Sequence, residues 1–201
     1  MKSAELEGEG DRFGFARLLH DLRKRRRRFR QFAGVAFVFL VTLRGEPSLA
    51  LWAGGSALVC LGMATRLWAS GFVMKNEVLA TSGPYGRVRH PLYVGNIVIC
   101  IGFCLASGLW WSYAAAVLVL LVFYPPAIEY EDRKLRRLFP GEWDQWAAQT
   151  RALLPSLRPY AGTATDDEQR WSLKLSLHRN GEPIHIAVLL ACLGYLYWLL
   201  P

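Results

Sequence analysis

Two short segments of the chain carry the residue types that could do chemistry. They hold an arginine, a histidine, a tyrosine and two acidic residues: Arg89, His90 and Tyr93 in the first segment, Glu131 and Asp132 in the second. Arg89 could grip a carboxylate through two parallel hydrogen bonds, and Glu131 could accept hydrogen bonds from hydroxyl or amino groups. The ring of Tyr85 or Tyr93 could face a cation, for about 0.5–2 kcal/mol. Together these groups could bind a small cation that also carries a carboxylate and hydroxyls.

Each of these residues also has an ordinary structural interpretation. An arginine before a membrane helix can snorkel to the surface, and Pro91 suits a first helical turn. An interfacial tyrosine and a packing glycine such as Gly95 are common in membrane helices. Glu131 and Asp132 lie beside two cations, as on many solvated helix faces. The hypothesis of a site therefore depends on the residues occurring together.

The elements that must position these residues are apolar. From Pro91 to Ile128 the chain has no charged residue, and uncharged stretches of this length predict transmembrane helices. We expect two spans here, at about 92–108 and 109–128, with Pro125-Pro126 breaking or kinking the second. Since a hairpin of two spans brings its ends together, both chemical segments should meet on one face of the membrane.

The same reading along the chain predicts an all-α, polytopic transmembrane protein with about five spans. Residues 1–30 form a basic cytoplasmic tail, and residues 31–158 form a transmembrane core that ends in a cytoplasmic helix at 129–150. Residues 159–201 form a cytoplasmic linker and a fifth span. The predicted spans cover about 31–46, 48–72, 92–108, 109–128 and 184–200.

Charge predicts the orientation in the membrane. The chain of 201 residues is 53% hydrophobic yet has a net charge of +8. With the N-terminus in the cytoplasm, every Lys and Arg except Arg44 lies on the inner side, as positive-inside bias requires; the C-terminus then lies outside. The arginine-rich run at 23–30 would attract anionic lipid at roughly 1 kcal/mol per residue. This interpretation is favoured over nucleic-acid binding, and we expect no nucleic-acid partner.

The four cysteines all lie in apolar segments: Cys60, Cys100, Cys104 and Cys192. Their spacing contains no Cys-x-x-Cys pair, and no histidine pair accompanies them. Buried thiols usually behave as small hydrophobic groups. We therefore predict neither a disulfide nor a metal site.

The two segments also resemble a known family. Gly-Pro-Tyr-x-x-Val-Arg-His-Pro-x-Tyr-x-Gly begins at Gly83, and the Glu-Asp pair, a leucine, and a phenylalanine with Glu-Trp follow in order. This two-part motif, within about residues 75–155, resembles the isoprenylcysteine carboxyl methyltransferase and phospholipid methyltransferase superfamily. The resemblance implies an S-adenosyl-L-methionine site at the cytoplasmic membrane surface and a methyl acceptor that arrives from the lipid phase.

Carried over position by position, the resemblance implies a set of site residues. Arg89 and Glu131 are the catalytic candidates. The candidates for binding the cofactor are Gly83, Pro84, Tyr85, His90, Pro91, Tyr93, Gly95, Glu131 and Asp132. The chain departs from the family pattern at Asp132, where a second glutamate is usual, and at Gly86, where a basic residue is usual. Phe139-Pro140-Gly141-Glu142-Trp143 also replaces the more usual Phe-Gly-Glu-Glu-Tyr, and we expect this part to position the helix after the site.

The expected reaction is methyl transfer to a lipid-phase or prenylated acceptor in a bacterial inner membrane. A carboxylate acceptor would need only neutralisation and orientation, for which Arg89 is the candidate. An amine would need to lose its proton, with help from Glu131 or His90. The alternatives are a non-catalytic membrane protein that keeps the fold, and a membrane reductase that binds a nicotinamide cofactor. The acceptor and the oligomeric state stay open at this point.

Overall fold

The computed structural model describes residues 33–74, 76–160, 162, 170–179 and 181–201. The chain divides into two compact units, Met1–Phe37 and Val38–Pro201. The predicted basic tail at 1–30 and its lipid-binding arginines lie outside the described residues. A short apolar helix, Ala33–Leu43, is the first element that the structure describes.

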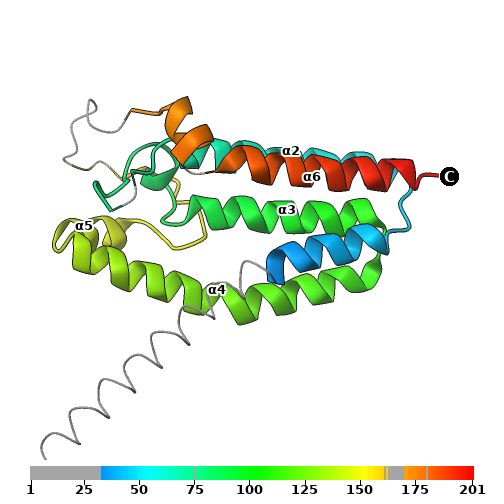
Figure 1. Cartoon of the computed structure of the whole chain (residues 1–201). Helices are drawn as coiled ribbons and strands as arrows, with labels where there is room; N and C mark the ends of the chain where they lie inside the picture. The colour runs from blue at the N-terminus through cyan, green and yellow to red at the C-terminus, as the bar shows by residue number, and fades with distance from the viewer. Residues whose placement is uncertain (1–32, 75, 161, 163–169, 180) are drawn as a thin grey trace, which may run out of the picture. The chain divides into compact units, whose positions relative to one another are not determined.

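The described part of the chain is all-helical, as predicted, and contains no β-strand. An isolated parallel bridge joins Val88 and Arg151. The helices and short helical turns, several of which are labelled in Figure 1, are α2 (Leu49–Ser70), the 3₁₀ turn η1 (Gly83–Gly86), α3 (Pro91–Ser107), α4 (Trp110–Leu138), α5 (Glu142–Gln149), the π-helical turn η2 (Leu175–Arg179) and α6 (Glu182–Trp198).

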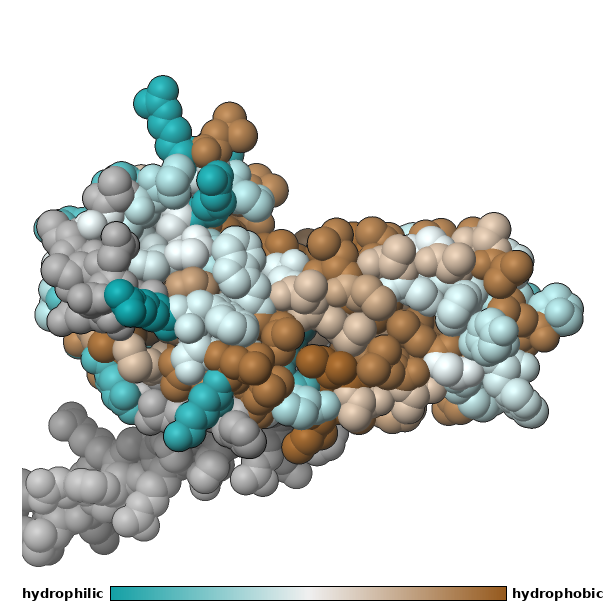
Figure 2. All heavy atoms as spheres, turned by 90° about the horizontal axis from the view of Figure 1, so that it is seen from above, coloured by the Kyte–Doolittle hydropathy of each residue, from teal (hydrophilic) through white to brown (hydrophobic). Residues whose placement is uncertain are grey.

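Two of the described helices, α2 and α4, are long and apolar enough to cross a membrane. Ala33–Leu43, α3 and α6 are apolar but shorter. Large apolar side chains such as Trp110 and Leu121 on α4 are exposed. Figure 2 shows apolar residues covering the flank of the helices, with hydrophilic residues gathered toward the end where Figure 1 places α5. This distribution is the one expected of helices in contact with lipid.

Glycines let α2 and α3 pack with their backbones in contact. Gly55 and Gly62 on α2 face Gly102 and Gly95 on α3, and each pair is separated by seven residues along its own helix. A Cβ at Gly55 would lie 2.4 Å from the Ala106 nitrogen, and one at Gly62 would lie 2.7 Å from the Gly95 oxygen. Small residues commonly bring membrane helices this close. The contact fixes the start of α3 against the end of α2.

Of the predicted break or kink at Pro125-Pro126, the break is wrong. Both prolines lie inside α4, which runs without interruption to Leu138. A proline removes one N–H donor but keeps a φ that suits a helix, and membrane helices tolerate the loss.

The predicted cytoplasmic helix at 129–150 is therefore not one element. Its first part is the end of α4, and α5 forms a separate helix after a turn. Gly141 makes this turn with a φ of +85°, a conformation that glycine adopts at little cost. The acidic pair at 131–132 thus lies on the same rigid helix as the predicted fourth span.

Helix α6 lies beside α2 (Figure 1). Near its C-terminal end, the Trp52 indole Nε1 donates a hydrogen bond to the Leu193 oxygen over 3.0 Å. At its N-terminal end, Glu182 pairs with Arg66 of α2. The C-terminal helix is thus attached to α2 at both of its ends.

Candidate functional site

The two chemical segments meet where the start of α3 faces the C-terminal half of α4. His90 Nε2 lies 3.0 Å from Asp132 Oδ1, and Arg89 Nη2 lies 3.6 Å from Asp132 Oδ2. The Tyr93 hydroxyl donates to Glu131 Oε2 over 3.0 Å. His90 Nδ1 lies 3.9 Å from the same Glu131 oxygen. Five of the predicted site residues therefore form one polar cluster, as the hairpin argument required.

A loop from the other chemical segment holds this cluster in place. The backbone N–H of Arg89 donates to the Arg151 oxygen over 2.9 Å, and that of His90 donates to the Ala152 oxygen over 3.1 Å. Pro91 follows as the first residue of α3 and is fully buried. Because these bonds use main-chain atoms, the side chains of Arg89 and His90 are left for the cluster.

Helix α5 supplies a wall beside Arg89. The Arg89 guanidinium carbon lies 5.8 Å from the centroid of the Trp143 ring, a cation–π distance. Arg89 Nη1 also donates to the Ala147 oxygen over 3.3 Å. Trp143 entered the sequence argument only as a residue that positions the helix, whereas the structure places it against the candidate catalytic arginine.

Two buried donors in this region have no hydrogen-bond partner among the described residues: Arg89 Nε and Trp143 Nε1. An unpaired buried donor costs about 1–3 kcal/mol, so both atoms suit a ligand that brings acceptor oxygens or nitrogens. Arg89 also lines an open cavity of about 740 Å³, with residues between Ala147 and Leu157 forming the rest of its wall. The region thus combines space with unsatisfied donors.

Tyr124 is a member of the site that the sequence argument missed. Its ring centroid lies 5.2 Å from that of Tyr93, which in turn lies 5.5 Å from the His90 ring. A signal was available, since Tyr124 precedes Glu131 by seven residues and shares its helix face.

The Gly-Pro-Tyr element lies outside the polar cluster of Arg89, His90, Tyr93, Glu131 and Asp132. Tyr85 is buried with Ala69, Leu79 and Trp146. The main-chain carbonyl oxygen of Tyr85 accepts a hydrogen bond from Trp146 Nε1 over 2.9 Å. Gly83 has a φ of +59°, and its neighbour Pro84 is buried. Burial raises the pKa of Tyr85, and the charge of Glu131 raises it further. Of these three predicted binding residues, Tyr85 contacts α5 through Trp146.

Gly95 also lies apart from the cluster. A Cβ there would lie 2.7 Å from Arg66 Cγ and 2.9 Å from the Gly62 oxygen. Its position on α3 is therefore the contact with α2. The geometry gives Gly95 the packing role that a membrane glycine commonly has.

Comparison with known proteins identifies the region that holds this cluster. Residues 48–142 match the phospholipid methyltransferase family. This region, a little under half of the chain, is similar to the phospholipid methyltransferase family and to an isoprenylcysteine O-methyltransferase. The family region contains α2, α3, α4 and every residue of the Arg89–Asp132 cluster. The predicted resemblance to this superfamily is confirmed, and the apolar helices together with it indicate a membrane protein.

Three curated relatives illustrate the range of similar proteins. The cobalt-zinc-cadmium resistance protein CzcN of Cupriavidus metallidurans is 36% identical over 120 residues, which are 59% of this chain and 53% of the relative. The nickel-cobalt-cadmium resistance protein NccN of Alcaligenes xylosoxydans xylosoxydans is 35% identical over 120 residues, 59% and 56% of the two chains. The protein-S-isoprenylcysteine O-methyltransferase of Schizosaccharomyces pombe is 28% identical over 118 residues, 59% and 50%.

The chain spans about half the length of these curated relatives. No solved structure matches it significantly. Two of the relatives are named for metal resistance; among the described residues of this chain, no group of three or more His, Cys, Asp or Glu side chains is placed to hold a metal ion.

Proposed function

We propose that this protein is an integral membrane methyltransferase that uses S-adenosyl-L-methionine and acts on a lipophilic acceptor. The observation that carries the proposal is the pair of unpaired buried donors, Arg89 Nε and Trp143 Nε1. They lie beside the polar cluster, which is inside the region that matches the methyltransferase family. Such donors suit an acceptor-bearing ligand, and the neighbouring carboxylates suit one that also carries hydroxyl, amino and cationic groups.

The residues present fit this cofactor. Arg89 and Trp143 would donate hydrogen bonds to its carboxylate or to other acceptor atoms. Glu131 is 47% exposed and would accept from the ribose hydroxyls or the amino group. The ring of Tyr93 would face the positive sulfonium. When bound, the cofactor supplies a methyl group that its sulfonium charge has already activated.

The chain's own residues then align and prepare the acceptor. Alignment of two reactants supplies roughly 7–11 kcal/mol in favourable systems. For a carboxylate acceptor, Arg89 would neutralise and orient the attacking oxygen. For an amine acceptor, Glu131 or His90 would take the proton, with Asp132 holding the imidazole through its 3.0 Å contact.

The proposal includes a placement in the bilayer. All five apolar helices of the described chain cross or enter it, with the N-terminus and the site on the cytoplasmic side of a bacterial inner membrane. A helix of 17 residues such as α3 rises about 26 Å, close to a hydrocarbon core of about 30 Å. The exposed apolar face of α4 supports an acceptor that approaches from the lipid phase, and the arginine-rich tail would bind anionic lipid.

Titration calorimetry with S-adenosylmethionine on the detergent-purified full chain tests the proposal. We expect saturable binding by the parent and a loss of about tenfold or more in Glu131→Gln, because a lost charged acceptor costs about 1.5–3 kcal/mol. Glu129→Gln is the matched control. Glu129 lies on the same helix, is 64% exposed and pairs with Arg133, so its change should leave the affinity unaltered.

A folded parent that shows no saturable binding would contradict the proposed cofactor. Equal losses in Glu131→Gln and Glu129→Gln would contradict the proposed site. If binding is confirmed, transfer of a labelled methyl group to carboxylate and amine lipids, tested separately, distinguishes O-methylation from N-methylation.

A further inference from the structure

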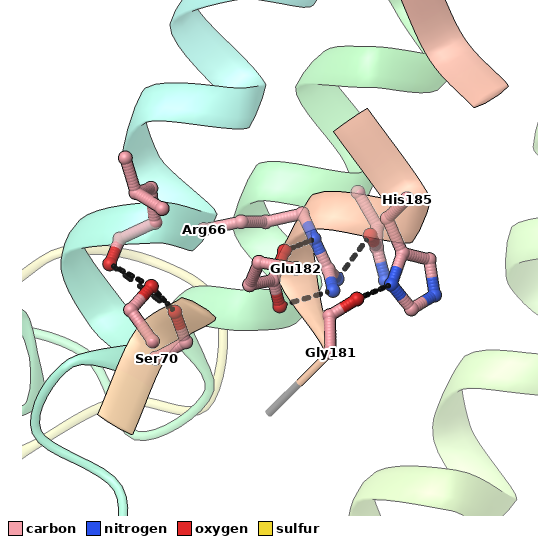
Figure 3. Close-up of polar contacts among 8 residues, drawn as sticks. Arg66, Ser70, Gly181, Glu182 and His185 are labelled. Atoms are coloured by element: carbon pink, nitrogen blue, oxygen red, sulfur yellow. Dashed lines mark hydrogen bonds and ion pairs between the residues drawn. The ribbon is translucent and has the colours of Figure 1, made fainter. Parts of the chain in front are cut away.

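A buried carboxylate outside the family region contacts the helices that build the site. Glu182 begins α6, and its side chain is 3% exposed. Its two oxygens accept hydrogen bonds from Arg66 of α2, at 3.1 Å from Nε and 2.7 Å from Nη2 (Figure 3). Arg66 is itself only 13% exposed. This is the two-pronged geometry in which a guanidinium binds a carboxylate most firmly.

The same arginine continues to α3. Arg66 Nη1 donates to Asn96 Oδ1 over 2.7 Å, and its aliphatic stem lies against Gly95. Asn96 lies three residues after Tyr93 on α3, which places the two side chains on one helix face. Glu182, Arg66 and Asn96 therefore form a continuous polar chain from α6 to the first turns of α3.

The segment before α6 is attached to the same end of α2. The hydroxyls of Ser70 and Ser176 lie 2.6 Å apart in a buried contact, drawn beside the Arg66–Glu182 pair in Figure 3. Ser176 also contacts the Leu67 oxygen at 3.1 Å, and the Ser172 N–H donates to the Gly71 oxygen over 3.0 Å. These hydrogen bonds hold the segment before Glu182 against the end of α2 that carries Arg66.

We propose that Glu182 is a positioning residue for the methyltransferase site, acting through Arg66 and Asn96 on the first turns of α3. The inference rests on the proposed function. Glu182 holds the Arg66 fork in one orientation, because a planar guanidinium bound at two nitrogens cannot rotate. The third nitrogen then meets Asn96, and the α3 turn that carries Tyr93 keeps its place opposite Glu131.

Charge supports the same connection. Arg66 lowers the pKa of Tyr85 and Glu182 raises it, both as smaller effects than burial. The pair therefore lies within electrostatic reach of the residue that supports α5 through Trp146. Without Glu182, Arg66 would be a buried cation lacking its carboxylate, an unfavourable state that drives the side chain toward other partners.

Hydrogen exchange and cofactor titration on the detergent-purified full chain test the inference. In Glu182→Gln we expect faster exchange at residues 92–96, whose Tyr93 and Val94 amides bond to the His90 oxygen. We also expect S-adenosylmethionine binding weakened about tenfold or more, as when one hydrogen bond to a charged group is lost. Glu182→Asp keeps the charge and should recover part of the affinity.

Trp52→Phe is the matched control, because it removes the hydrogen bond between α2 and α6 at the other end of the helix. It should alter neither readout. Unchanged exchange at 92–96 in Glu182→Gln would overturn the inference whether or not the parent binds the cofactor. A parent that binds none would instead count against the proposed function, and exchange would still report on the positioning.

The double variant Arg66→Met with Glu182→Met separates positioning from charge balance. It removes the buried pair without leaving an unpaired charge, a change that proteins often tolerate. Positioning predicts that binding stays weak, because the link to Asn96 is lost. Recovery of the parent's affinity would show that Glu182 only neutralises Arg66, and would overturn the inference.

Discussion

The contacts of Asp132 explain how a shorter side chain serves where the family usually has a glutamate. One of its oxygens lies 3.0 Å from His90 and the other 3.6 Å from Arg89. The backbone bonds of Arg89 and His90 to the loop at 151–152 bring both residues to α4. The shorter aspartate side chain therefore still reaches both His90 and Arg89, and it joins them in one network.

Tyr85 should make the stability of the folded protein depend on pH. Burial raises its pKa in the folded protein above the unfolded value of about 10. Its contribution to stability is therefore complete below about pH 10 and is lost as the pH rises toward the folded pKa, by up to about 1.4 kcal/mol per pH unit. Tyr85→Phe keeps the buried ring without the ionisation.

We expect the thermal midpoint of the parent to fall more steeply than that of Tyr85→Phe between about pH 10 and pH 11. Thermal unfolding in detergent, followed by circular dichroism, measures the difference. Parallel slopes for the two proteins would refute this account of Tyr85.

Among the helices, α2 and α3 pack so closely that their contact requires glycine at several positions. Its glycines leave no space for a methyl group, and the atoms that a new Cβ would meet are mainly backbone atoms that cannot move alone. This contact sets the height of α3 relative to α2, and hence the position of Arg66 beside Asn96.

Neighbouring glycines provide a sharp test of this packing. Gly55→Ala should destabilise the protein by about 1–3 kcal/mol, as overpacking does, because its Cβ would lie 2.4 Å from the Ala106 nitrogen. Gly54→Ala meets only a leucine methyl at 3.4 Å and should be neutral or stabilising by up to about 1 kcal/mol. Thermal unfolding of both variants in detergent measures the difference, and similar midpoints would argue against a backbone contact.

For the whole molecule, the C-terminal helix joins the family region rather than standing apart from it. Arg66 and Glu182 are 116 residues apart in the chain, and Trp52 and Leu193 are 141 apart. These long-range contacts mean that residues after the family region help to hold the site's helices in place.

The orientation of the whole chain in the membrane can be tested with fusions. Arg170 and Lys174 precede α6, so the start of α6 should be cytoplasmic. In bacteria, alkaline phosphatase, which is active only outside the cytoplasm, should be active when fused after Pro201. It should be inactive when inserted at Gly162. The reverse pattern would invert the proposed topology and move the site to the outer face.

The sequence by itself determined the helical class, the apolar segments and the meeting of the two chemical segments. These features follow from local hydropathy and from the geometry of a hairpin, both of which can be read along a chain. The family motif likewise lies within short stretches, so Arg89, His90, Tyr93, Glu131 and Asp132 could all be found before the structure.

Only the tertiary structure decided which of all the predicted site residues share one cluster and which lie elsewhere. It placed Gly95 against Arg66, Tyr85 under α5 and Trp143 against Arg89. It also carried α4 through Pro125-Pro126. The physical reason is that side-chain partners depend on how helices dock, and docking is set by close contacts between residues far apart in the chain. Glu182 shows this most clearly, since no local pattern connects it to Arg66.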